Sequence, residues 1–122
     1  MKRSRSGVKR LFDAAGHSLR GIRAAWQHEA AFRQTILLAV VLFALSFALA
    51  RSVEQWLLLN LPLILLLIVE LLNSAIENVV DRIGLELHQL SGRAKDMAAA
   101  SVLFCHVLIA TAWITITWVN LL

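Results

Sequence analysis

The sequence has few charged residues and a single cysteine. Asp, Glu, Lys and Arg make up 16% of the 122 residues, and they gather at the N-terminus and between Asp81 and Asp96. Cys105 lies within an apolar run, so the chain forms no intrachain disulfide, and we interpret this residue as a packed small side chain. No internal repeat, low-complexity segment or lipidation motif is visible. These absences exclude a disulfide-stabilised domain and disfavour an ordinary soluble one.

What the sequence has in excess is apolar residues in long runs. Hydrophobic residues make up 59% of the chain, and the mean hydropathy is +0.71. Runs of about 20 apolar residues are long enough to cross a bilayer as helices. We therefore expect one all-α, membrane-embedded domain over residues 1–122. Its three transmembrane helices are predicted at residues 30–50, 55–81 and 97–121.

A different pattern precedes the first span. Apolar residues spaced by 3, 4 and 7 fall on one side of a helix over residues 8–26, and cationic residues occupy the other side. The apolar set is Val8, Leu11, Phe12, Ala15, Leu19, Ile22 and Trp26. A helix with one apolar and one cationic face is typical of a segment that lies in the membrane interface.

The distribution of lysine and arginine predicts the orientation in the membrane. These residues precede the first span and recur in the polar connection Arg82–Asp96, where Gly84 and Gly92 are expected to mark bends. The positive-inside rule then places the N-terminus and this connection on the cytoplasmic side of the membrane. The basic pI of 10.2 is interpreted as attraction to anionic lipid headgroups, not to nucleic acid.

The most informative stretch runs from Glu70 to Asp81, in the second predicted span. At about 100° per residue, Asn73, Ser74 and Glu77 share one side of the helix with both of these acids. A charge near the bilayer centre costs about 2.5–3.5 kcal/mol on insertion scales, so the two glutamates of this stripe, Glu70 and Glu77, predict a functional site. The structural alternative is a polar seam between helices, for which amides and hydroxyls suffice.

Two chemistries suit this arrangement. The acids could relay ions, or they could serve phosphoryl transfer, which needs a metal, a cation on the phosphates and a base for the nucleophile. In the second case Glu29 and Glu77 would hold Mg²⁺, Lys95 would contact phosphates, and Glu70 would take a proton from a lipid alcohol. Glu29 could instead pair with Arg33, four residues later on a helix.

No Walker A sequence, protein-kinase glycine loop, HRD or DFG motif is present, so any kinase would be of an unrelated design. The sequence Glu70-x-x-Asn-Ser-Ala-Ile-Glu77-x-x-Val-Asp81-Arg82 resembles the signature of the small prokaryotic membrane diacylglycerol kinases. Two further blocks support the resemblance, Ala24-Ala-Trp-x-x-Glu-Ala-Ala-Phe-Arg-Gln34 and Leu90-Ser-Gly-Arg-Ala-Lys-Asp-Met97. The first of these is closer to the Gram-negative branch than to the related undecaprenol kinases.

The resemblance implies a homotrimer with active sites shared between chains, which uses ATP and Mg²⁺ to convert diacylglycerol to phosphatidate. It implies that Glu70 is the general base, that Glu29 and Glu77 are metal ligands, and that Asn73 supports them. The residues implied for ATP are Arg10, His17, Glu29, Glu77, Glu86, His88, Lys95 and Asp96. Those implied for the lipid are Arg10, Ala14, Ala15, Ser18, Arg23, Trp26, Ala31, Phe32, Arg33, Gln34, Glu70, Ala99, Trp113 and Trp118.

The chain also departs from the family pattern. His17 and Leu19 stand where relatives often carry aromatic residues, and Thr35 replaces an acid common in relatives. An undecaprenol kinase is the alternative within the same superfamily. From other classes, the alternatives are a subunit of an ion-coupled membrane transporter and a purely structural membrane subunit. The former has no use for the cytoplasmic pair Lys95–Asp96, and the latter does not need the two glutamates.

Overall fold

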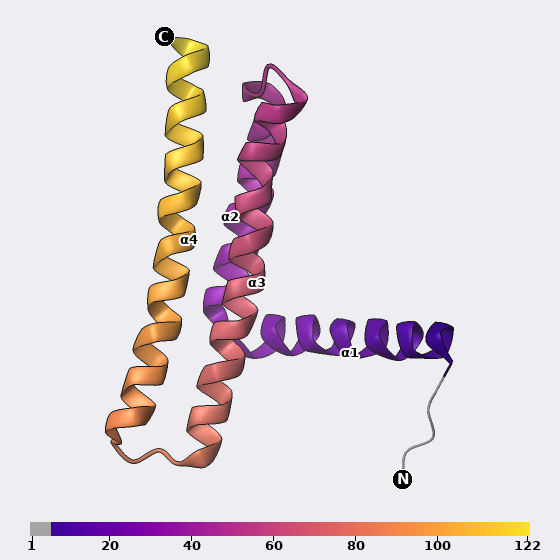
Figure 1. The fold of residues 1–122 in the computed structure, drawn as a ribbon, viewed down its shortest axis with the longest axis vertical. Coiled ribbons are helices and arrows are strands. Elements are labelled where there is room, and N and C mark those ends of the chain that lie inside the picture. The colour runs from indigo at the N-terminus through magenta and orange to yellow at the C-terminus, as the bar shows by residue number, and fades with distance from the viewer. Residues whose placement is uncertain (1–5) are drawn as a thin grey trace.

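The structure is a computed structural model, and it describes residues 6–122. Within these residues it contains four α-helices and no strand: α1 (Gly7–His28), α2 (Ala30–Leu49), α3 (Val53–Ile83) and α4 (Gln89–Leu121). Helices α2, α3 and α4 run side by side, and α1 projects sideways from the bundle (Figure 1). The prediction of an all-α protein with a leading helix and three long apolar helices is confirmed.

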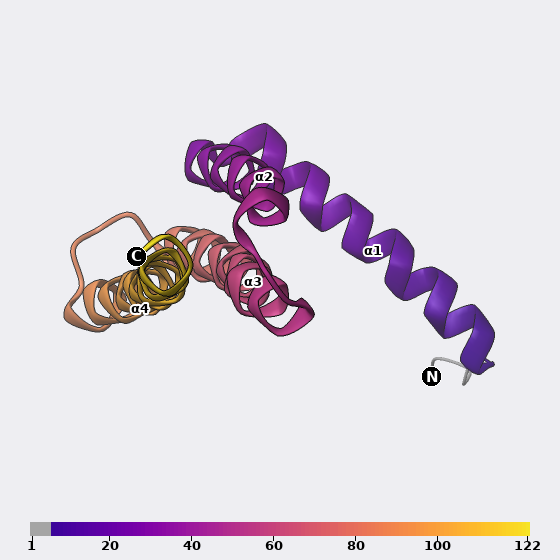
Figure 2. The same cartoon turned by 90° about the horizontal axis from the view of Figure 1, so that it is seen from above.

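Helix α3 is the central helix of the bundle. It packs against α4 along much of its length and against α2, whereas α2 and α4 make few contacts with each other (Figure 2). Each of these three helices is long and apolar enough to cross a membrane, with a mean hydropathy of 2.0–2.1 over its most apolar window. At about 1.5 Å per residue, the 31 residues of α3 span about 46 Å, more than the hydrocarbon core of a bilayer.

Helix α1 projects from the base of α2. The side chain of Ser6 caps its N-terminus by accepting a hydrogen bond from the Lys9 backbone N–H. The helix ends at His28, and the extended backbone of Glu29 (φ −119°, ψ 102°) makes the turn into α2. The large apolar side chains along α1 are 46–74% exposed, among them Phe12, Leu19 and Trp26. An apolar face that the chain leaves uncovered fits a helix that lies along a membrane surface.

One prediction about the connections was wrong. Residues 82–96 are not a polar connection, because α3 continues to Ile83 and α4 begins at Gln89. The link therefore comprises only residues 84–88. Gly92 lies inside α4 and marks no bend. The His88 side chain accepts a hydrogen bond from the Leu90 backbone N–H, and this cap starts α4 eight residues before the predicted span.

The core lies between α3 and α4. Leu63, Leu66, Cys105 and Ile109 are buried together, which confirms that Cys105 is a packed side chain. Polar contacts hold the end of the bundle that is distant from α1: the Asn120 amide nitrogen donates to the Leu49 carbonyl (2.8 Å) and to the side-chain oxygen of Gln55 (2.8 Å). In hydrocarbon such hydrogen bonds are worth about 0.6 kcal/mol each on average, so packing supplies most of the stability.

Candidate functional site

The polar stripe of α3 runs from a buried end to an exposed end. Glu70 and Ser74 are only 5% and 6% exposed, Asn73 and Glu77 are half-buried, and Asp81 is exposed. Glu70 lies about 10 Å further into the bundle than Glu77, at about 1.5 Å per residue. The stripe thus connects the end of the bundle that carries the α3–α4 link to an acid enclosed between helices.

Glu70 is held by α2. The hydroxyl of Thr35 donates a hydrogen bond to Glu70 Oε1 over 3.3 Å, and Thr35 itself is 6% exposed. From the sequence, Thr35 was interpreted only as a departure from the family pattern. Nothing in the helical periodicity of either segment could reveal this contact, because it depends on how α2 packs against α3.

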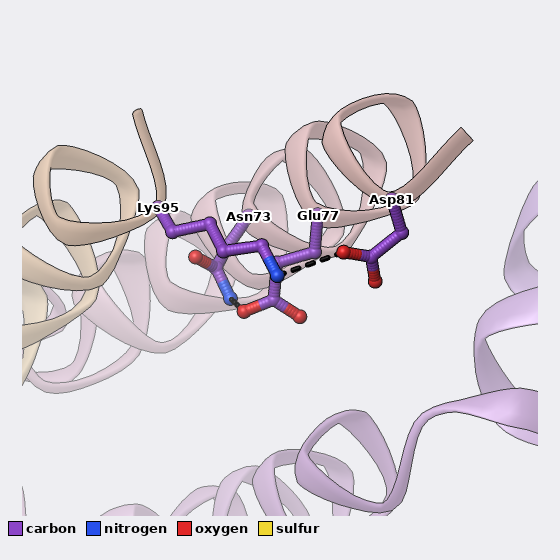
Figure 3. A network of polar contacts seen from close by, with 4 residues as sticks. All are labelled: Asn73, Glu77, Asp81 and Lys95. Carbon is purple, nitrogen blue, oxygen red and sulfur yellow. Dashed lines mark hydrogen bonds and ion pairs between the residues drawn. The ribbon is translucent and has the colours of Figure 1, made fainter. Parts of the chain in front are cut away.

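Glu77 lies in a group of polar side chains at the ends of α3 and α4 (Figure 3). The amide nitrogen of Asn73 donates to Glu77 Oε1 over 3.3 Å, as expected for residues four apart on a helix. Lys95 reaches across from α4 and forms an ion pair with Asp81 (2.7 Å). This contact with Asp81 and the negative charge of Glu77 both raise the pKa of Lys95. One cation therefore lies beside two carboxylates at the exposed end of the stripe.

Glu29 contacts α3 from the junction of α1 and α2. Its Oε1 accepts a hydrogen bond from the amide nitrogen of Asn78 over 3.4 Å. The alternative pairing with Arg33 is not formed, since Arg33 Nη1 donates instead to the Trp26 carbonyl over 2.6 Å. Asn78 directly follows Glu77 in the sequence, so Glu29 meets α3 one residue away from the second carboxylate. Asn78 was not among the residues predicted from the sequence.

A cavity of about 460 Å³ lies between α1 and α3. Its polar lining includes Ser18, His28 and Glu29 from the first helices and Ser74 and Asn78 from α3, and small or apolar residues complete it. This volume falls within the range of about 300–1,000 Å³ that small-molecule sites occupy. The cavity thus brings together Ser18, which was predicted to contact the lipid, and Glu29, which was predicted to bind the metal.

A smaller cavity of about 120 Å³ lies at the α3–α4 link. Its charged and titratable lining residues are Asp81, Glu86, His88 and Lys95, and Val80, Gly84, Leu85, Leu87, Ser91 and Gly92 complete it. Three residues predicted to contact the nucleotide, Glu86, His88 and Lys95, thus meet in one place. The cavity is too small for a whole nucleotide but matches a phosphate-sized group beside a lysine.

Other predicted residues do not join these cavities within one chain. Arg10, Ala14, Ala15, His17 and Arg23 are exposed along α1, and His17 contacts Arg20 (2.6 Å). Ala31, Gln34, Asp96 and Ala99 are exposed, and Phe32 is buried.

The two tryptophans of α4 lie towards the opposite end of the bundle from the α3–α4 link. Trp113 donates from Nε1 to the Leu59 carbonyl (3.0 Å), and Trp118 is exposed. Residue 59 precedes Glu70 by eleven residues on α3, which is about 16 Å along the helix axis. The structure of one chain does not bring these tryptophans to Glu70.

The arrangement defines a class of protein. It is a small α-helical membrane protein that encloses one acid at depth and presents two more carboxylates, a lysine and a surface helix at one end. Ionisable residues at this depth are, by default, candidates for a functional site.

Comparison with known proteins identifies the family. Residues 16–117 match the family model described as prokaryotic diacylglycerol kinase. The chain is 46% identical over 121 residues to a diacylglycerol kinase of Escherichia coli (strain K12), with 97% of each chain covered. It is 47% identical over 114 residues to one of Pseudomonas aeruginosa (93% of each chain), and 44% identical over 107 residues to one of Helicobacter pylori (88% of this chain, 84% of the relative). The chain belongs to the prokaryotic diacylglycerol kinase family.

Proposed function

We propose that the protein is an ATP-dependent lipid kinase that transfers the γ-phosphoryl group of ATP to the free hydroxyl of diacylglycerol and forms phosphatidate. Membership of the family and the names of the relatives support this activity. The observation that carries it most directly is Glu70, an acid that is 5% exposed in the middle of an apolar helix. A buried carboxylate beside lipid suits a base for an alcohol that arrives from the bilayer.

The chemistry divides between Glu70 and the polar residues at the bundle end. Glu70 accepts the proton of the diacylglycerol hydroxyl while that oxygen attacks the γ-phosphorus. The bond between the γ-phosphorus and the bridging oxygen breaks, and ADP leaves with that oxygen. Lys95 is placed to neutralise phosphate charge, and the cavity that it lines with Glu86 and His88 is the candidate phosphate site. Asp96, Arg10 and His17 would add contacts to the nucleotide.

The residues present fit a magnesium ion. Mg²⁺ is bound by oxygen ligands and commonly uses one or two carboxylates together with substrate phosphates. Glu29 and Glu77 would supply these carboxylates, and each accepts a hydrogen bond from an amide of α3, which orients its carboxylate. No group of three or more His, Cys, Asp or Glu side chains suited to a metal occurs within residues 6–122, so phosphate oxygens would complete the shell. When bound, the ion would neutralise charge on the phosphates.

The lipid would approach along α1. Ser18 and Glu29 line the cavity between α1 and α3, and the uncovered apolar face of α1 would lie on the membrane. Ala14, Ala15, Arg23, Trp26 and residues 31–34 would line this side. The protein would sit in the bacterial inner membrane, with its N-terminus and the α3–α4 link in the cytoplasm near anionic headgroups. Neighbouring chains of a homotrimer would complete each site, and Ala99, Trp113 and Trp118 are the residues that need such a neighbour.

The related alternative is an undecaprenol kinase, which shares the central signature. An ion-coupled transporter subunit is less well supported, because a relay of ions gives no role to the cavity lined by Glu86, His88 and Lys95 at the end of the bundle.

A side-by-side assay tests the proposed activity. Purified protein in detergent should consume ATP only when Mg²⁺ and diacylglycerol are both present, and labelled phosphate should appear in phosphatidate. Undecaprenol in the same micelles should be phosphorylated at least tenfold more slowly. If undecaprenol is phosphorylated faster than diacylglycerol, undecaprenol is the acceptor. If neither lipid is phosphorylated, the lipid-kinase function is rejected.

The role of Glu70 predicts a specific loss. Glu70→Gln should reduce turnover to a low residual rate, because an amide cannot accept the proton, while the helical fold and binding of an ATP analogue are retained. Removal of a positioned base typically costs 10²–10⁴-fold in rate. Glu54→Gln, the same change at an exposed acid in the first turn of α3, is the matched control and should keep full activity. Near-normal turnover in Glu70→Gln would remove Glu70 from the role of base.

The metal assignment predicts a different signature. Glu77→Gln should weaken Mg²⁺-dependent binding of the nucleotide, since one of the two proposed carboxylate ligands is lost. Titration of an ATP analogue at fixed protein with increasing Mg²⁺ should show a midpoint shifted at least tenfold upwards. An unchanged midpoint would exclude Glu77 as a ligand.

A further inference from the structure

The hydrogen bond between Thr35 and Glu70 joins two helices at the deepest polar point of the stripe. Both side chains are about 95% buried, and the Thr35 hydroxyl lies 3.3 Å from Glu70 Oε1. The part that this contact plays in the proposed kinase reaction rests on Glu70 being its base.

The direction of the Thr35 hydroxyl is unusual for this chain. Hydroxyls in helices commonly turn back to a carbonyl one turn earlier. Ser18, Ser101 and Thr111 do so here, each donating to the carbonyl four residues before it at 2.8–3.2 Å. Thr35 instead donates across to α3. A β-branched side chain is also restricted at χ1, so the donor is held in a fixed direction.

The two carboxylate oxygens of Glu70 differ in their hydrogen bonding. Oε1 receives the Thr35 hydroxyl, whereas no hydrogen bond to Oε2 occurs within residues 6–122. A glutamate side chain has three rotatable bonds, and burial of its charge away from water is costly unless a donor meets it. One fixed donor on Oε1 therefore limits the rotation of the carboxylate and leaves Oε2 as the oxygen that meets a substrate hydroxyl.

We propose that Thr35 is a positioning residue that fixes Glu70 through Oε1 and thereby presents Oε2 to the hydroxyl of the acceptor lipid. Thr35 does not itself contact the reacting atoms. Its effect is on the geometry of proton transfer, in which a misplacement of about 1 Å can cost about 10²-fold in rate. Its loss should therefore appear in kcat and not in the affinity for either substrate.

The test is Thr35→Val, which keeps the branched shape and removes the donor. We expect kcat with diacylglycerol to fall at least tenfold, while KM for MgATP and for diacylglycerol changes less than twofold. Thr35→Ser, which restores a hydroxyl, should recover most of the lost kcat. A wild-type kcat in Thr35→Val, or a rise in the lipid KM without loss of kcat, would overturn the proposal.

Ser46→Ala is the matched control for a purely structural effect. Ser46 is also a buried hydroxyl of α2, it accepts a hydrogen bond from Asn60, and it lies eleven residues further along the helix, about 16 Å away. Its loss should lower the resistance to unfolding and leave kcat per folded molecule unchanged, with folded molecules counted by binding of an ATP analogue. An equal loss of kcat in Ser46→Ala would show that the effect of Thr35→Val comes from general packing, and it would reject the positioning role of Thr35.

A double variant separates this proposal from the proposed function. In a Glu70→Gln background, Thr35→Val should cause no further loss, because residues that act as a unit are not additive. A further loss of tenfold would show that Thr35 acts independently of Glu70. By contrast, an inactive wild-type protein would reject the kinase function itself, and full activity in Glu70→Gln would reject the role of Glu70 as the base.

Discussion

The cost of a carboxylate inside hydrocarbon governs the structure of this protein. A charge near the bilayer centre costs about 2.5–3.5 kcal/mol on insertion scales, so Glu70 is tolerable only where other helices shield it from acyl chains. The central place of α3, between α2 and α4, supplies that shield. Thr35 from α2 adds a hydrogen-bond donor, and the packed core of α3 and α4 begins directly beside the acid at Leu66 and Cys105.

In the proposed reaction, the two substrates would bind at different levels of α3, because one end of its polar stripe is exposed and the other is buried. Its exposed end carries Asp81 and Lys95 beside a phosphate-sized cavity, which suits a water-soluble nucleotide. Its buried end carries Glu70, which suits an alcohol that never leaves the bilayer. Helix α1 meets the bundle between these levels, at the turn made by Glu29, and its uncovered apolar side would guide a lipid towards the cavity against α3.

Much of this arrangement follows from the sequence, and the rest depends on how helices meet. Periodicity was sufficient to place Glu70, Asn73, Glu77 and Asp81 on one side of a single helix, because a helix has a fixed rotation per residue. The contact between Thr35 and Glu70 joins two segments 35 residues apart, so no local pattern contains it. The early start of α4 was missed because polar residues 89–96 resemble a loop in composition, although the His88 cap makes them helical.

The central claim is that Glu70 is enclosed in order to take a proton from a lipid hydroxyl. An experimental structure with diacylglycerol and a non-hydrolysable ATP analogue with Mg²⁺ tests it most directly. We expect the lipid hydroxyl within hydrogen-bond reach of Glu70 Oε2, about 2.6–3.2 Å, and in line with the γ-phosphorus. A carboxylate turned towards acyl chains, or locked onto an arginine with the hydroxyl bound elsewhere, would contradict the account.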